Sequence, residues 1–365
     1  MQAQLTQEET KTKFSLNCVY LYFSKYCNLR CRHCWIDPEF STDRTPKDNE
    51  LDVKSLFLAL DECQKLGMNS VKITGGEPFL RADIFELLDY IKDRNLNVTF
   101  ETNATLIKQK EARALKQVKV SQVAVSIDGP NARIHELLRG IKGSFAEAIE
   151  GIKFLKEHNL NVQLIISLWR QNKDYLKSVI ELSRSLGVNS VKINIISCIA
   201  RADKMLKDQE VLSVKEVIDC YKQLMQQLQK EPAFAVHFDI PPAFQPLKNG
   251  RLRDLYNCSI LNILGILADG RLSICGIGDS LDTLVLGKVG QDSIKDIWCN
   301  HPILEDIRKN VPYNLKGVCG KCILRYYCLG KCRAEAFYAK GSFVAPFSFC
   351  QQAYEQGLFP ISRLI

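Results

Sequence analysis

The sequence predicts an α/β protein that is built on a parallel sheet and followed by a smaller, cysteine-rich unit. Short runs of β-branched residues alternate with stretches whose apolar residues recur at helical spacing. Two helical stretches end at a glycine, Gly67 or Gly187, and a strand pattern follows each glycine directly. The second unit is predicted by the loop-rich segment after Cys319, whose dense cysteines can organise a fold around metal.

Six runs are expected to form strands, with helical patterns between them. The expected strands are residues 19–23, 70–74, 97–101, 120–127, 162–168 and 188–195. The helical patterns cover residues 52–66, 84–91, 145–155 and 175–186. Strands that alternate with helices favour a parallel sheet with right-handed crossovers. Six such units suit either an open doubly wound sheet or an incomplete barrel, and the pattern does not choose between them.

The pattern changes after residue 195. A long helical stretch at 211–228 leads to a proline-containing connector at 231–246, and Asp269-Gly270 then gives a strong hairpin signal. We therefore expect four parts: a short extension (1–18), the sheet domain (19–210), a bridging helix with its connector (211–257) and a cysteine-rich domain (258–365).

Composition predicts an ordinary globular protein of the cytoplasm. Of the 365 residues, 46% are hydrophobic and 25% charged, which excludes a disordered chain, a collagen-like fibre and a coiled-coil rod. Residues 1–13 have no apolar signal core, and no stretch approaches the roughly 18 apolar residues of a membrane span. The net charge of +8 comes without a basic tract. We therefore expect no nucleic acid and no membrane as partners, while a mildly cationic surface suits an acidic partner.

Cysteine is the unusual residue, because 15 cysteines cannot all pair within one chain and a cytosolic protein keeps its thiols reduced. Such a count points to metal or redox chemistry. Cys27, Cys31 and Cys34 form a C-x3-C-x2-C motif directly after the first expected strand. Three thiolates can bind one face of a metal centre and leave a position open. Structural zinc is the alternative, but zinc sites usually pair C-x2-C units and close all four positions.

This motif, at this place in a six-fold βα pattern, resembles that of the radical S-adenosylmethionine (SAM) superfamily. The resemblance implies a partial (βα)6 TIM-like barrel with its site at the carboxyl ends of the strands. It also implies that Cys27, Cys31 and Cys34 hold a [4Fe-4S] cluster whose fourth iron binds SAM. One electron from the cluster then cleaves SAM, and the resulting 5′-deoxyadenosyl radical abstracts hydrogen from a substrate.

Further motifs at the strand ends resemble the SAM-binding positions of that family. Gly75, Gly76 and Glu77 match the motif that binds the SAM amino group, since glycines permit close approach and a carboxylate accepts from an ammonium. The resemblance implies that Ser126 contacts the ribose and that Arg139 meets the SAM carboxylate, although Arg139 also fits a plain surface residue. The other cofactor contacts that the resemblance implies are His33 and Asn103.

The C-terminal cysteines resemble the SPASM extension of radical SAM enzymes, and every spacing of that pattern is met. The resemblance implies two auxiliary [4Fe-4S] clusters. The distal cluster would be held by Cys319, Cys322, Cys328 and Cys350, and the proximal one by Cys258, Cys275 and Cys332. Some members supply a fourth proximal cysteine where this chain has Leu252, so that position is open or has an unidentified ligand. A zinc ribbon is the alternative, but it requires two C-x2-C pairs.

Five cysteines remain outside these motifs. Cys63 and Cys220 lie on apolar helix faces and are expected in the core. Cys198 follows the sixth expected strand, at the mouth of the barrel, and is a candidate catalytic hydrogen-atom donor or the missing ligand. An inert buried thiol is the alternative for Cys198. Cys18 and Cys299 complete the five.

The resemblance predicts a radical SAM peptide maturase, because peptide and protein modifiers dominate the SPASM group. Such an enzyme crosslinks, oxidises or excises residues of a ribosomal precursor peptide, with a reductant such as flavodoxin or ferredoxin. About eighteen residues precede the first expected strand, too few for a leader-binding domain, so a separate leader-binding protein or the barrel itself would read a leader.

Three alternatives stay open. One is an anaerobic sulfatase maturase, although that group has an aspartate where this chain has Gly276. Another is a small-molecule enzyme that acts on a porphyrin or sugar. The third is an iron–sulfur electron carrier without SAM chemistry, against which the proposed SAM contacts argue.

Overall fold

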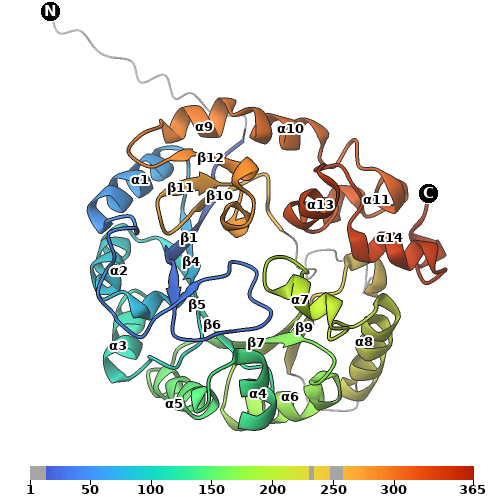
Figure 1. The fold of residues 1–365 in the computed structure, drawn as a ribbon, viewed down its shortest axis with the longest axis horizontal. Coiled ribbons are helices and arrows are strands. Elements are labelled where there is room, and N and C mark those ends of the chain that lie inside the picture. The colour runs from blue at the N-terminus through green and yellow to red at the C-terminus, as the bar shows by residue number, and fades with distance from the viewer. Residues whose placement is uncertain (1–13, 230–233, 247–257) are drawn as a thin grey trace, which may run out of the picture.

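The computed structural model describes residues 14–229, 234–246 and 258–365. Ten strands form one sheet in the order β12-β11-β10-β1-β4-β5-β6-β7-β8-β9, and helices pack around its outside (Figure 1). The six central strands are β1 (Cys18–Ser24), β4 (Ser70–Gly75), β5 (Asn97–Thr102), β6 (Gln122–Ser126), β7 (Val162–Leu168) and β8 (Ser190–Ile195). Each of them pairs in parallel with the next. The prediction of a parallel, partial TIM-like barrel is confirmed.

Helices connect and cover these strands. They are α1 (Val53–Lys65), α2 (Ile84–Asp93), α3 (Gln109–Gln117), α4 (Ala132–Arg139), α5 (Ser144–Glu157), α6 (Leu176–Ser185), α7 (Ala202–Lys207) and α8 (Val214–Leu228). Their starts follow the sequence: Asp52 caps α1 by accepting from the Ser55 amide at 2.9 Å, and Ser213 and Glu216 form a capping box on α8. Cys63 is fully buried on the inner face of α1, as expected for a core residue.

Two strands extend the barrel sheet in ways that the sequence pattern did not indicate. β9 (Ala235–Phe238) lies within the expected connector and pairs in parallel with β8. β10 (Ile263–Ile266) pairs in parallel with β1, whose outer edge would otherwise be unpaired. The expected hairpin is present as β10 and β11 (Arg271–Ser273), and β12 (Val285–Lys288) continues it. The C-terminal hairpin is therefore part of the barrel sheet and not of a separate sheet.

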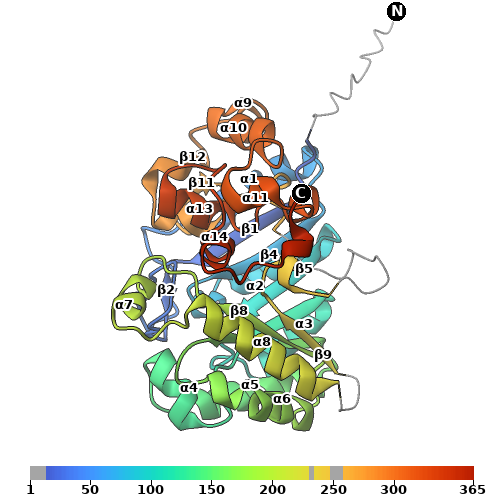
Figure 2. The ribbon, with the colours of Figure 1, turned by 90° about the vertical axis from the view of Figure 1, so that its right-hand side faces the viewer.

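The remaining C-terminal elements are short helices beside the open side of the barrel (Figures 1 and 2). They are α9 (Ile294–Asn300), α10 (Pro302–Asn310), α11 (Gly317–Lys321), α12 (Arg325–Cys328), α13 (Arg333–Lys340) and α14 (Ser348–Glu355). One apolar core runs from the barrel strands into these helices, and it includes Val19, Leu264, Trp298 and Phe349. Within the described ranges, no helix combines the length and the apolar character that crossing a membrane requires.

Candidate functional site

The loop that carries Cys27, Cys31 and Cys34 follows β1 and is held at both ends. Its ends pair as the two-residue strands β2 (Tyr26–Cys27) and β3 (Glu39–Phe40). Its middle is fixed to the end of α4, because the amide of Arg30 donates to the carbonyl of Arg139 at 3.0 Å. A second backbone hydrogen bond runs from the amide of Arg32 to the carbonyl of Leu138 at 2.9 Å. The loop conformation is thus set by backbone bonds and leaves the cysteine side chains free to bind.

The three thiols lie close enough to influence one another. Burial raises the pKa of Cys27, and the neighbouring Cys31 raises it further. Burial and Cys31 likewise raise the pKa of Cys34 to about 11. Cys27 Sγ accepts from the Leu29 amide at 3.4 Å, and the Nδ2 atom of Asn103 lies 3.8 Å from the same sulfur. A bound metal centre is the usual way to keep such crowded, buried thiols ionised, so the donor set fits a cluster.

In the described parts of the chain, no group of at least three His, Cys, Asp or Glu side chains is placed to coordinate a single metal ion. The assignment of cysteines to clusters therefore stays a prediction that rests on the motif and on the donor chemistry.

The turn of Gly75 and Gly76 brings the end of β4 against the cysteine loop. A Cβ atom on Gly76 would lie 1.9 Å from the carbonyl oxygen of Tyr26, and Gly75 has a φ of +122°. The amide of Gly76 donates to Ser24 at 2.7 Å. The close approach that these glycines permit is thus to the protein backbone. Their predicted contact with SAM is not tested by these distances.

Glu77 is fully buried and already has hydrogen-bond partners. Its carboxylate accepts from the hydroxyl of Thr102 at 2.8 Å and from the amide of Asn103 at 2.9 Å. Burial raises the pKa of Glu77 to about 7, although these hydrogen bonds act in the opposite direction. Through them Glu77 positions Asn103, whose side chain reaches Cys27. The predicted contact of Glu77 with an ammonium stays a prediction.

Arg139 is the last residue of α4 and is buried, which excludes the alternative of a plain surface residue. Its Nε atom donates to Asp128 at 2.5 Å, and its Nη1 atom lies 3.6 Å from the sulfur of Cys31. Asp128 also accepts from the Ser167 amide at 2.8 Å. Arg139 is therefore held beside the cysteine loop by a buried carboxylate that the sequence reasoning missed, although Asp128 stands two residues after Ser126.

Two histidines adjoin this ion pair. Burial and the positive charge of Arg139 lower the pKa of His33 to about 4, so its imidazole is neutral at pH 7. Burial also lowers the pKa of His135 to about 4. The Nδ1 atom of His33 is buried without a hydrogen-bond partner among the described residues. An unpartnered buried nitrogen within the cysteine loop fits a bound polar cofactor.

Ser126 and Cys198 lie at the carboxyl ends of their strands. Ser126 is the last residue of β6 and pairs with Ile165 of β7. Cys198 follows β8, and burial together with the negative charges of Glu335 and Asp203 raises its pKa to about 11. Cys198 is therefore a neutral thiol near α13. Neither its catalytic role nor its role as a ligand is tested by these contacts.

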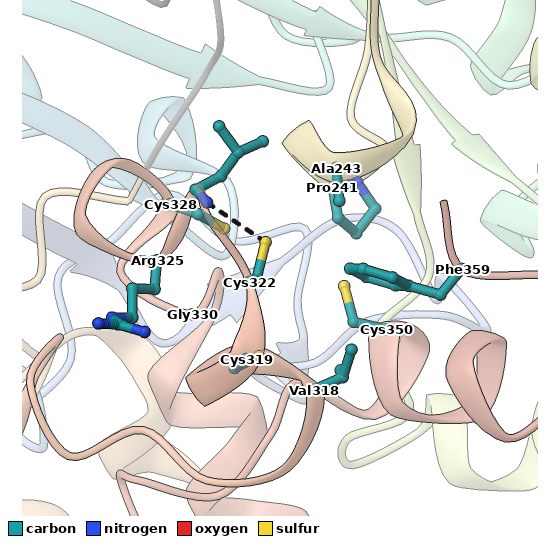
Figure 3. Close-up of a pocket in the computed structure, with 11 residues that line it drawn as sticks. Pro241, Ala243, Val318, Cys319, Cys322, Arg325, Cys328, Gly330, Cys350 and Phe359 are labelled. Carbon is teal, nitrogen blue, oxygen red and sulfur yellow. Dashed lines mark hydrogen bonds between the residues drawn. The ribbon is translucent and has the colours of Figure 1, made fainter. Parts of the chain in front are cut away.

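The four predicted distal ligands line one cavity between α11, α12 and α14. Cys319, Cys322, Cys328 and Cys350 all border it, together with apolar side chains such as Phe359. Figure 3 shows the side chains of Cys322 and Cys350 directed into the same space. Burial raises the pKa of Cys350, and the three other thiols raise it further. The residues thus fit a shared cluster in a mostly apolar cage.

The three predicted proximal ligands come from separate elements and also converge. Burial raises the pKa of Cys275 to about 12, and Cys258 contributes to that increase. Burial raises the pKa of Cys332, at the start of α13, and Glu335 and both of these thiols raise it further. Leu252, the position where some SPASM members place a fourth cysteine, lies outside the described residues.

A pocket of about 430 Å³ opens beside the cysteine loop, between that loop and α7. Its lining is Arg30, Cys31, Arg32, Phe40, Arg201, Lys204 and Met205. Arg201 joins the two walls, because its Nη2 atom donates to the Pro38 carbonyl at 2.7 Å and its side chain pairs with Asp37. Four cationic residues and, among the described residues, no acidic one line this pocket. Three of these cations also pair with a carboxylate outside the lining: Arg32 with Glu210, Arg201 with Asp37 and Lys204 with Asp208. The sequence did not reveal this grouping, since its members come from segments about 170 residues apart.

Comparisons with known proteins agree with this architecture. Residues 21–183 match the radical SAM superfamily, and residues 258–323 match SPASM, an iron-sulfur cluster-binding domain. This chain is a radical SAM enzyme of the SPASM type.

Relatives of this radical SAM enzyme include proteins named as heme synthases and proteins named as maturases. An AdoMet-dependent heme synthase of Oleidesulfovibrio alaskensis is 27% identical, over 90% of this chain and 85% of the relative. The mycofactocin maturase MftC of Mycobacterium tuberculosis is 25% identical, over 90% of this chain and 81% of the relative. Among solved structures, Streptococcus suis SuiB bound to its precursor peptide SuiA has a TM-score of 0.74 at 20% identity, covering 93% of this chain and 76% of SuiB. The shared fold is that of radical SAM enzymes with a SPASM domain.

Proposed function

We propose that this radical SAM enzyme modifies a residue of a ribosomal precursor peptide. The observation that carries the proposal is the open, cation-lined pocket beside Cys31, which suits an acidic peptide segment brought next to the site of radical formation. Support also comes from the similarity to a mycofactocin maturase over 90% of this chain, and from the fold shared with SuiB, which has been solved with a precursor peptide.

When bound, SAM supplies a 5′-deoxyadenosyl radical that takes hydrogen from the substrate. The residues of this chain prepare that reaction. Cys27, Cys31 and Cys34 would hold the cluster, while Asp128 keeps Arg139 oriented beside Cys31. His33 is neutral and offers a buried nitrogen. The C-terminal cysteines would hold two auxiliary clusters that accept an electron or bind substrate, and the reductant would be a flavodoxin or ferredoxin.

A sulfatase-type maturase is disfavoured by the surroundings of Gly276. That group has an aspartate base at this position, but a Cβ atom on Gly276 would lie 2.4 Å from the ring of Tyr22. Tyr22 is itself buried on β1. An aspartate at this position would require the buried Tyr22 ring to move. The local packing therefore disfavours an aspartate base at position 276.

A second candidate is an oxidoreductase that acts on a carboxylate-bearing tetrapyrrole. The observation that favours it is the 27% identity, over 90% of this chain, with a protein named AdoMet-dependent heme synthase. The cationic pocket suits the carboxylates of a tetrapyrrole as well as those of an acidic peptide.

The two candidates are separated by one set of anaerobic assays on the reconstituted protein. We expect 5′-deoxyadenosine from SAM and reductant, and a mass change on a short acidic peptide encoded beside the enzyme and expressed with it. An iron porphyrin with propionate groups is the second arm. A changed porphyrin with an unchanged peptide favours the second candidate. Absence of 5′-deoxyadenosine in every arm contradicts both.

The role of the pocket is tested with a matched pair of lysines. Lys204 lines the pocket and pairs with Asp208, and Lys215 forms the same i,i+4 pair with Asp219 on α8. We expect Lys204→Gln to raise KM for the acidic substrate by about two- to fivefold at low salt, an effect that salt screens. Lys215→Gln is the control. Equal changes in both variants would exclude a substrate contact at Lys204.

A further inference from the structure

The C-terminal region contains a fully buried guanidinium group with an unusual set of partners. Arg333 is 0% exposed. Its Nη1 atom donates to the carbonyls of Phe343 at 2.9 Å and Ala345 at 2.6 Å, and its Nη2 atom donates to Gly330. Its Nε atom is buried without a partner in the described part of the chain. The hydrogen bonds of Arg333 therefore fix its position but do not neutralise its charge.

No carboxylate among residues 14–229, 234–246 and 258–365 forms an ion pair with Arg333. Burial raises the pKa of Glu335, which disfavours its negative charge, although Arg333 acts in the opposite direction. The side chain of Glu335 is hydrogen-bonded to the Ser197 hydroxyl at 2.9 Å. The neighbouring Lys331, by contrast, pairs with Asp239. A buried cation without a counter-charge is strongly unfavourable, because water no longer solvates it. Arg333 thus requires negative charge from another source.

The available source is the surrounding cysteines. Arg333 directly follows Cys332 in the chain, and its Nη2 atom donates to Gly330, which borders the same cavity as Cys319, Cys322, Cys328 and Cys350. These cysteines belong to both predicted ligand sets, since Cys332 is proximal and the others are distal. Neutral thiols carry no charge, whereas thiolates bound to iron–sulfur clusters do. Arg333 lies where the negative charge of both clusters would be felt.

We propose that Arg333 is the buried counter-charge shared by both auxiliary clusters and that it sets their reduction potentials. The proposal rests on the two ligand sets in the proposed function. A fixed positive charge in a medium of low dielectric stabilises the reduced form, which carries one more negative charge, and so raises the potential. The step is the gain of one electron by a cluster, without bond formation or proton transfer. Arg333 therefore makes both clusters better acceptors of the electron that product formation releases.

The test compares full-length wild-type protein with Arg333→Met, Arg333→Lys and Arg308→Met after anaerobic reconstitution. Arg308 is a matched control, because it is a partly buried arginine of the same region that packs on Trp298 and Phe14 and donates to a carbonyl. Iron and sulfide are measured first. The auxiliary clusters are then reduced with dithionite at controlled potentials and followed by electron paramagnetic resonance.

In Arg333→Met we expect the ratio of reduced to oxidised auxiliary cluster at fixed potential to fall about tenfold, equal to about 59 mV for a one-electron couple. Arg333→Lys should restore most of the shift, and Arg308→Met should show none. Unchanged potentials in an Arg333→Met protein with full iron content would overturn this proposal alone. Wild-type protein that binds no iron at the C-terminal cysteines would overturn the ligand sets and this proposal together.

Thermal unfolding covers the case in which Arg333→Met binds no auxiliary cluster. In metal-free protein the charge of Arg333 is not compensated, and Arg333→Lys keeps that charge whereas Arg333→Met removes it. We therefore expect Arg333→Met to lower the Tm of the metal-free protein less than Arg333→Lys does. A purely structural arginine gives the opposite order, because lysine keeps part of the carbonyl bonding. That order would overturn the proposal.

Discussion

Arg139 and Arg333 are both buried beside predicted cluster ligands, but the protein balances their charges differently. Arg139 donates to the carboxylate of Asp128 at 2.5 Å and approaches Cys31 at 3.6 Å. Arg333 donates only to carbonyls and has a buried Nε atom without a partner in the described ranges. The barrel site is therefore electrically balanced by the protein itself. On our proposal, the C-terminal site is balanced only when its cysteines are ionised as cluster ligands.

This difference matches what the two sites would hold. SAM must bind and leave in each turnover, so a site that is stable in its absence can exchange it without losing its structure. Auxiliary clusters stay in place, so their negative charge can be a permanent part of the folded protein. The C-terminal region is thus expected to depend on metal for its stability more than the barrel does.

The largest expected effect separates the two cysteine sets. Replacing Cys27, Cys31 and Cys34 together by Ala should reduce 5′-deoxyadenosine formation to background, because no ligand remains for the cluster that binds SAM. Replacing Cys319 and Cys322 by Ala should preserve SAM cleavage and stop product formation. Chromatography of the nucleoside and mass spectrometry of the substrate measure the two outcomes. Full turnover after loss of the C-terminal cysteines would contradict the role of the auxiliary clusters.

The next effect concerns the charge balance of the barrel site. Asp128→Asn leaves Arg139 buried and unpaired, which we expect to cost about 3–5 kcal/mol of unfolding free energy. Urea unfolding of the metal-free protein measures this cost. The control is Asp61→Asn, which breaks a partly exposed pair with Arg94 and should cost about 0–1 kcal/mol. Similar losses in both variants would show that the barrel site is not balanced by Asp128.

A smaller effect is expected from the pH dependence of Glu77. Its pKa in the folded protein is about 7, above its ordinary value of 4.5, so the folded state binds a proton more tightly than the unfolded state. Stability from this group is therefore fully present below pH 4.5 and is lost as the pH rises through 7. Removing the group should flatten the pH dependence by about 3 kcal/mol across that window. Urea unfolding of metal-free wild type and Glu77→Gln at pH 5 and pH 8 tests this. An equal change in unfolding free energy between the two pH values in both proteins would contradict it.

Much of the barrel was predictable because its signals are local. The six central strands follow short β-branched runs, and the glycines that end two helices mark turns along the chain. The pairing of β10 with β1 was not predictable, because strand partners so distant in sequence leave no periodic signal. β9 was missed for a related reason, since four residues in a connector carry too little pattern to stand out.

For the candidate site, the sequence indicated the ligand types but not how their charges are balanced. The spacing of the cysteines identified both motifs, because ligands to a cluster must leave the backbone at short, defined intervals. Asp128 beside Arg139, and Arg333 among cysteines from both sets, became visible only in three dimensions.

By itself, then, the sequence determined the αβ alternation, the two cysteine motifs and the membership of a chemical family. The tertiary structure decided that the hairpin joins the barrel sheet, that four cations share one pocket and that two buried arginines have opposite electrical surroundings. The physical reason is range. Helical periodicity and ligand spacing act between near neighbours in the chain, whereas electrostatic balance depends on distances through space between residues that the fold alone brings together.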